Sequence, residues 1–221
     1  PAMIDAFAWA LIHFLWQGIL LGALAWLVLR AVPERLAPLR YAVACALLAG
    51  MATCPAVTVL TYGATPDAVP VPATDWAEWA VAFWSAGLCV MSVRALGGWT
   101  FAWRRQHRER GPLPEALVSA VRRLSERMKV RRTVRWLVSA RVEVPQVFGW
   151  LKPVVLVPAS ALTAMPPEQI EALLAHELAH VRRHDFLVNV CQVLIETALF
   201  YHPAVWWLSA RIREEREACC D

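Results

Sequence analysis

The sequence has little formal charge over most of its first hundred residues. Neither Ala6 to Leu29 nor Tyr41 to Tyr62 contains Asp, Glu, Lys or Arg, and a third apolar run from Trp76 to about Trp103 is interrupted by Arg94. With 58% hydrophobic and 18% charged residues, the chain is too apolar for an ordinary soluble domain of its size. Apolar runs of about 20 residues match the thickness of a bilayer core. The sequence therefore predicts a lipid bilayer as partner and three membrane spans, at about residues 6–29, 41–62 and 76–103.

The cysteines form no recognisable disulfide framework. Some lie in apolar runs, where a free thiol behaves as a small hydrophobic group, and the last two are neighbours that cannot readily bridge each other. They are Cys45, Cys54, Cys89, Cys191, Cys219 and Cys220. The sequence also contains no motif of a base-reading module, so we expect no direct nucleic-acid partner. It gives no indication of the oligomeric state.

Arginines cluster after the first and the third apolar run, whereas the Pro-rich loop from Gly63 to Asp75 contains no Lys or Arg. The clustered residues are Arg30, Arg35 and Arg40, then Arg104, Arg105, Arg108 and Arg110. Basic loops stay on the cytoplasmic side of a membrane. The pattern predicts an outside N-terminus, a transmembrane region over residues 1–103 and a cytosolic domain over residues 104–221.

A zinc-protease signature lies in the run from Ile170 to His180, which carries His176-Glu-Leu-Ala-His180. On an α-helix two residues four apart share one face, about 6 Å apart along the axis, so both imidazoles can reach one metal ion. Glu177 is placed to take a proton from a zinc-activated water and to pass it to a leaving amine. Pro166-Pro167-Glu168 is a plausible helix start.

A catalytic zinc site usually has three protein ligands. His184 continues the helical row but lies about 12 Å along the axis from His176, so we expect it to end the helix or support a ligand. The C-terminal run Glu217-Ala-Cys-Cys-Asp221 offers a better third ligand, because Glu217 and Asp221 are one helical turn apart. One of the two can bind the metal while the other orients a ligand histidine.

The segment from Phe186 to Leu208 is apolar enough for a fourth span, but a span would carry Glu217 to the opposite side of the membrane from His176. His202-Pro203 resolves the conflict, because proline breaks the helical hydrogen-bond ladder. We therefore predict a re-entrant or membrane-surface helical hairpin over residues 186–217. Within it, Glu196 would need a partner such as Arg94 or water.

The region before the zinc motif predicts a small α+β domain. Glu115 to Val130 is typical of an amphipathic helix, and the β-branched runs Thr133 to Ser139, Arg141 to Val144 and Val154 to Val157 predict short strands. A strand edge beside the zinc helix could hold a substrate as an added strand, and we expect it within Pro145 to Val157.

In combination, these motifs resemble the BlaR/MecR-type membrane zinc metallopeptidases, which are bacterial antirepressor and sensor proteases. The resemblance rests on the zinc motif with the following Val-Arg-Arg-His-Asp185, on Pro145 to Pro158, on Tyr201 to Trp207 and on Glu217-Ala-Cys-Cys-Asp221. It implies a multi-pass protein of the bacterial inner membrane with a cytosolic, zincin-like (gluzincin) α+β domain. It assigns zinc ligation to His176, His180 and Glu217 and the general base to Glu177. With Glu217 as the ligand, the spacing argument leaves Asp221 as the supporting carboxylate.

The resulting expectation is a zinc-dependent endopeptidase that cleaves a cytosolic protein, such as a DNA-binding transcriptional repressor, in transmembrane signalling. Two alternatives fit the same motifs. The chain could be an HtpX-like quality-control protease of the membrane, or a signalling scaffold in which zinc is purely structural. An intact Glu177 argues against the scaffold, because a structural zinc site needs no base. The family normally continues beyond the position of Asp221, and we find no penicillin-binding sensor domain in this sequence.

Overall fold

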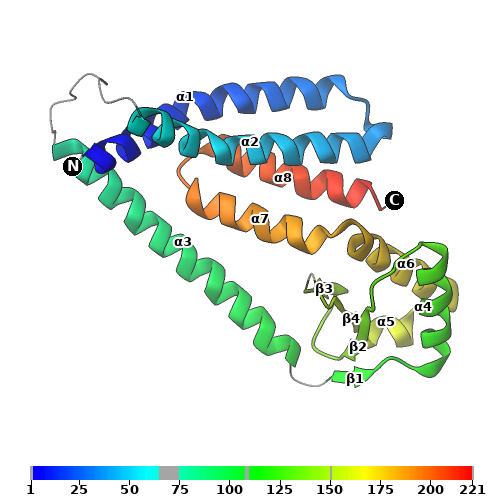
Figure 1. Cartoon of the computed structure of the whole chain (residues 1–221). Coiled ribbons are helices and arrows are strands. Elements are labelled where there is room, and N and C mark those ends of the chain that lie inside the picture. The colour runs from blue at the N-terminus through cyan, green and yellow to red at the C-terminus, as the bar shows by residue number, and fades with distance from the viewer. Residues whose placement is uncertain (1, 65–74, 108–109, 150, 221) are drawn as a thin grey trace. The chain divides into compact units, whose positions relative to one another are not determined.

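A computed structural model describes residues 2–64, 75–107, 110–149 and 151–220, and these residues are mostly helical with one small mixed sheet (Figure 1). In chain order the elements are α1 (Ala2–Ala31), the 3-10 helix η1 (Glu34–Leu36), α2 (Ala37–Ala64), α3 (Asp75–His107), β1 (Arg110–Pro112), α4 (Glu115–Arg127), β2 (Arg135–Ser139), β3 (Gln146–Phe148), β4 (Val154–Pro158), α5 (Ala159–Ala164), α6 (Pro167–Arg183), α7 (Asp185–Ala198) and α8 (Pro203–Ala218). The chain divides into two compact units, residues 1–95 with 192–219 and residues 96–191 with 220–221.

Three helices are long and apolar enough to cross a membrane, and they overlap the three spans predicted from the sequence. They cover Met3–Ala31, Glu34–Tyr62 and Trp76–Phe101. Much of their large apolar surface faces outward, as at Leu20, Leu60 and Trp79. Such surface is unfavourable in water and suited to lipid. The chain is therefore a membrane protein, while its orientation and the domain limits at residues 103 and 104 stay predictions.

In the first unit, α1 packs along α2, and α8 packs against both helices (Figure 1). The approach of α1 to the start of α8 is close at Gly18, where an added Cβ would come within 2.6 Å of the His202 ring. That ring is buried and bonded at both nitrogens. Its Nε2 donates to the Leu15 carbonyl at 3.0 Å, and its Nδ1 accepts from the Ala204 amide at 3.2 Å. His202 is therefore a structural residue that caps α8.

The predicted break at His202-Pro203 is confirmed, because α7 ends at Ala198 and α8 begins at Pro203. Polar side chains in the second half of α7 form hydrogen bonds with side chains of α8. Glu196 accepts hydrogen bonds from Ser209 and, at 2.8 Å, from Arg213. Its partners are thus residues of α8, rather than the Arg94 or water expected from the sequence. The placement of this hairpin in or on a membrane stays a prediction.

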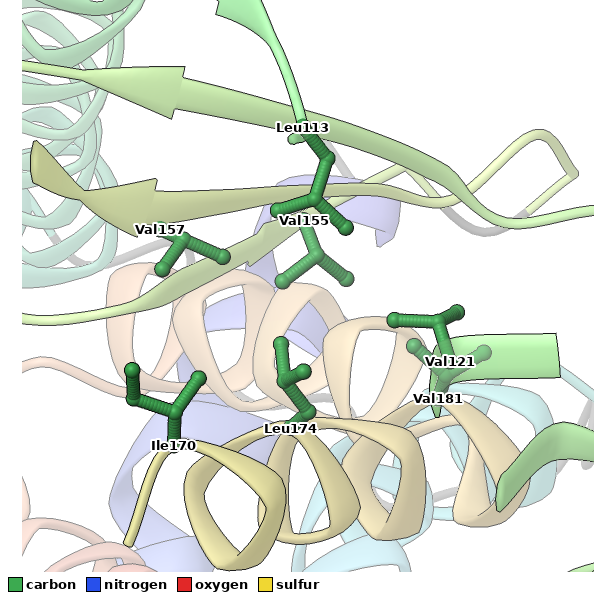
Figure 2. Close-up of a cluster of buried hydrophobic side chains, with 7 residues drawn as sticks. All are labelled: Leu113, Val121, Val155, Val157, Ile170, Leu174 and Val181. Atoms are coloured by element: carbon green, nitrogen blue, oxygen red, sulfur yellow. The ribbon is translucent and has the colours of Figure 1, made fainter. Parts of the chain in front are cut away.

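The second unit contains a sheet of four strands in the order β1-β2-β4-β3. β2 runs parallel to β4, and the outer strands β1 and β3 are antiparallel to their neighbours. Beside it lies the buried cluster in Figure 2, which the sheet and its flanking segment, α4 and α6 build together. Its members are Leu113, Val121, Val155, Val157, Ile170, Leu174 and Val181. This core fixes α6 against the sheet. The zincin-like character of the fold stays a prediction.

One predicted strand was wrong. Residues Arg141 to Val144 form a turn and bends, and the strand follows at Gln146–Phe148. The turn after β3 accounts for the difference, because turn geometry sets strand register. Gly149 has a φ of 79°, a left-handed conformation that favours glycine, and the chain reversal there places Val147 opposite Val155.

Candidate metal centre

The metal motif lies on α6, whose sequence explains its orientation. The helix begins with proline at its first position and has Glu168 in its first turn, where a negative charge favours the helix dipole. Its apolar face, with Ile170, Leu174 and Val181, is buried in the core of the second unit. His176 and His180 lie outside that buried row and are half-buried.

The two motif histidines face each other. Their Nε2 atoms are 3.1 Å apart, and the ring planes are nearly perpendicular. Two nitrogens bound to one tetrahedral zinc ion, each about 2.0–2.1 Å from it, would be about 3.3 Å apart. The observed separation therefore fits a shared zinc ion. Borderline-soft imidazole nitrogens are also the donors that zinc prefers.

Asp185 orients His180. Its carboxylate accepts a hydrogen bond from Nδ1 of His180 at 2.7 Å, so the proton resides on Nδ1 and Nε2 keeps its lone pair for a metal. The turn that permits this contact is made by His184, which has a left-handed backbone with a φ of 62° and caps α6. The predicted role of His184 as a helix end is thereby confirmed.

Charge around Asp185 keeps the carboxylate ionised. Its burial by itself raises the pKa, but hydrogen bonds from His180 and Arg183 and the positive charge of Arg183 outweigh burial and hold the pKa of Asp185 below its ordinary value. Burial lowers the pKa of Arg183, but the bonds and charge of Asp185 outweigh it and raise that pKa overall. The Arg183 guanidinium donates to Asp185 at 2.8 Å through Nη2.

A third metal-binding atom lies close to the histidines, and it is the sulfur of Cys220. Its Sγ is 3.7 Å from Nε2 of His180. It also accepts a hydrogen bond from Arg183 at 2.9 Å. In the described residues, one atom each from His176, His180 and Cys220 lie within 4.8 Å of one another. This set of donors could hold a metal ion.

The remaining predicted site residues have different environments. Glu177 is buried on α6. Glu217 lies in the last turn of α8, in the first compact unit, and is exposed. Its position relative to the histidines stays a prediction. Asp221 lies outside the described residues.

Sequence reasoning missed Asp185, Arg183 and Cys220 as members of the centre. The phrase Val-Arg-Arg-His-Asp185 directly follows the second histidine and contains a carboxylate of the kind that supports zinc-bound histidines. This pattern could have indicated Asp185 as a supporting carboxylate. The contact itself required the turn at His184, which a helical spacing argument does not anticipate.

Comparison with known proteins identifies the family of the chain. The model of the family described as BlaR1 peptidase M56 matches residues 3–221. The chain therefore belongs to the BlaR1 peptidase M56 family, which is a family of peptidases. This confirms the resemblance inferred from the motifs.

Among individual relatives, the chain is 28% identical to the regulatory protein BlaR1 of Bacillus licheniformis over 105 residues, which cover 48% of the chain and 17% of that protein. It is 27% identical to the methicillin resistance mecR1 protein of Staphylococcus aureus (strain Mu50) over 106 residues, which cover 44% of the chain and 18% of that protein. The match thus spans less than a fifth of the length of these relatives.

Proposed function

We propose that the chain is a zinc-dependent endopeptidase of the bacterial inner membrane that cleaves a cytosolic protein in transmembrane signalling. The observation that carries this proposal is the pair of Nε2 atoms 3.1 Å apart on α6, one of them oriented by Asp185. Membership of a peptidase family whose curated members include a regulatory protein supports it. A transcriptional repressor as substrate rests on the resemblance of the motifs alone.

The ligands in this proposal are His176, His180 and Glu217. A zinc ion bound there would lower the pKa of a water ligand to about 7 and polarise the carbonyl of the substrate. Glu177 would accept the proton from that water on its carboxylate and then donate it to the leaving amine. Glu177 is buried on α6, next in the chain to the first of the two histidines. Asp185 keeps His180 in the tautomer that can bind metal, and Asp221 is the second supporting carboxylate of the proposal.

The outer edge of β3 is our candidate for substrate binding. β3 is an edge strand of the sheet and contacts α6. A small pocket beside His180 is lined by Val147 and Gly149 of the hairpin that β3 starts. An extended peptide added to this edge would have its main chain hydrogen bonded and one peptide bond close to the histidines.

The proposed topology has the N-terminus outside and the metal centre in the cytosol, because the arginine clusters follow the first and third spans. Single cysteines introduced at Ala68 and at Glu115, in a background without other reactive thiols, test it. An impermeant thiol reagent added to intact cells should label the first and spare the second. Labelling of both positions, or of Glu115 alone, would contradict this orientation.

The experiment that tests the function compares Glu177→Gln with the parent protein. The variant should bind zinc like the parent because the side chain is not a ligand. It should cleave protein substrate at least about a hundredfold more slowly, because general acid–base groups contribute about 100- to 10,000-fold. Glu171→Gln, at an exposed position on the same helix, is the matched control and should retain both zinc and activity.

Three outcomes discriminate between the hypotheses. If zinc-loaded Glu177→Gln gives full signalling output in cells, the chain is a scaffold and the peptidase proposal is wrong. If His184→Ala loses zinc while Glu217→Ala keeps it, the ligand set is wrong. If the peptidase degrades misfolded membrane proteins and spares a repressor encoded beside it, the HtpX-like alternative replaces the signalling function.

A further inference from the structure

We propose that the sulfur of Cys220 is a ligand of the metal in the resting protein. This inference rests on the metal centre of the proposed function and adds to it a residue that holds the centre in a closed form. The sulfur and the two histidines already form a compact group of three donors.

The distance fits sulfur and nitrogen bound to one ion. With a zinc–sulfur bond of about 2.3 Å and a zinc–nitrogen bond of about 2.0–2.1 Å, tetrahedral ligands would lie about 3.5 Å apart. Cys220 Sγ lies 3.7 Å from Nε2 of His180. The two Nε2 atoms, at 3.1 Å, satisfy the same geometry. The three donor atoms as a group lie within 4.8 Å of one another, so one ion could contact all of them once the sulfur moves closer to His176.

The charge around the sulfur also fits. A cysteine binds metal as the thiolate, and the Arg183 guanidinium donates a hydrogen bond to Sγ at 2.9 Å. Arg183 is itself held by Asp185, to which Nη2 donates at 2.8 Å. The Arg183 cation therefore donates hydrogen bonds to two groups, the Asp185 carboxylate that orients His180 and the sulfur of Cys220. The neighbouring Cys219 instead caps α8, with its amide bonded to the Glu215 carbonyl at 3.1 Å.

Coordination explains what such a sulfur would do. A catalytic zinc site has three protein ligands and keeps its fourth position open for water, whereas four protein ligands close the site. With His176, His180 and Glu217 as the catalytic ligands, Cys220 would fill the fourth position. Activation would then require the sulfur to leave with its electron pair and water to take its place. This ligand exchange involves neither oxidation nor reduction.

Cobalt substitution of the full-length protein in detergent tests the proposal. Cobalt(II) replaces zinc and gives an intense near-ultraviolet charge-transfer band when a thiolate is bound. We expect one cobalt ion per chain and this band in the parent protein. Cys220→Ser should lose the band, and the matched control Cys219→Ser should keep it. His176→Ala should lose both the band and the stoichiometric cobalt.

The outcomes separate this proposal from the proposed function. If the parent binds one cobalt ion through the histidines but shows no thiolate band, or if the band survives in Cys220→Ser, Cys220 is not a ligand and the inference is overturned while the metal centre stands. If the parent binds no cobalt that depends on His176, the metal centre itself is wrong. Thiol alkylation followed by mass spectrometry gives a check without variants, because zinc should protect Cys220 and leave the labelling of Cys219 unchanged.

Discussion

In the first unit, large apolar side chains such as Leu60 and Trp79 face outward, with 70% and 75% of their surface exposed. In the second, Val155 and Leu174 are completely buried between the sheet and α6. The polar side chains of the two units also differ in their arrangement. Arg40 and Glu215 of the first unit form a largely buried ion pair, whereas the polar side chains around α6 converge on the candidate metal centre.

This difference indicates which interactions stabilise each unit. Apolar side chains that face lipid gain little from burial, so the first unit depends on close helix contacts and on charges that neutralise each other. The second unit has an interior that excludes water, and its stability follows the usual hydrophobic rules. Substitutions of the same chemical kind should therefore have different effects in the two units.

The largest effect is expected from Arg40→Met. Arg40 donates to Glu215 at 2.6 Å and also to the carbonyls of Leu29 and Val32. Removing it leaves the Glu215 carboxylate without its cation, and breaking a buried pair costs about 3–5 kcal/mol of unfolding free energy. The exposed pair of Arg211 with Glu214 provides the control, since Arg211→Met should cost less than about 1 kcal/mol. Denaturant unfolding in detergent measures both, and equal losses would remove the distinction between the two kinds of pair.

Leu174→Ala should cost about 2–5 kcal/mol of unfolding free energy, because it leaves a cavity in the core of Figure 2. Leu20→Ala is the control in the first unit, where the same side chain is exposed. Its cost should stay within about 0.5 kcal/mol. Thermal unfolding of both variants gives the comparison. A larger loss for Leu20→Ala would mean that this face of α1 is covered by protein.

Asp185→Asn should weaken zinc binding by about 10- to 100-fold, the usual cost of losing a carboxylate that supports a histidine ligand. The cause is the lost charge at the hydrogen bond to His180. Competition with a chromogenic chelator measures the affinity. Glu171→Gln, on the exposed face of α6, should leave it unchanged. Unaltered zinc affinity in Asp185→Asn would show that His180 is not a ligand.

The smallest effect is expected from Gly18→Ala. The new methyl group would meet the His202 ring, which two hydrogen bonds hold in place, and we expect a loss of about 1 kcal/mol, the low end for overpacking. Gly50→Ala adds the same methyl group where nothing lies within 4 Å. Unfolding of the two variants under the same conditions should rank Gly18→Ala as the less stable.

Much of the fold follows from the sequence, because its strongest signals are local. Uncharged runs predict the three spans, Pro203 marks the start of α8, and the spacing of His176 and His180 predicts a shared face on α6. Each of these depends on a few neighbouring residues and on the geometry of one helix.

The parts that the sequence did not reveal depend on tertiary contacts. Glu196 could not be assigned to Arg213 without the packing of α7 on α8. Cys220 was predicted only to form no disulfide with its neighbour Cys219, because nothing in the adjacent sequence indicates its contact with Arg183 or His180. The β3 strand was placed a few residues early because the conformation of Gly149 decides its register.

The turn between α6 and α7 consists of a single residue, His184, so the site should tolerate almost no change in chain length there. Each residue of a helix turns by about 100° around its axis, and one inserted or deleted residue would swing the Asp185 carboxylate away from Nδ1 of His180. Asp185 also begins α7, where its negative charge favours the helix start. The Asp185 carboxylate thus has two roles: it stabilises the start of α7, and it fixes the tautomer of His180. Length variation should accumulate in the other connections of the chain and spare this one.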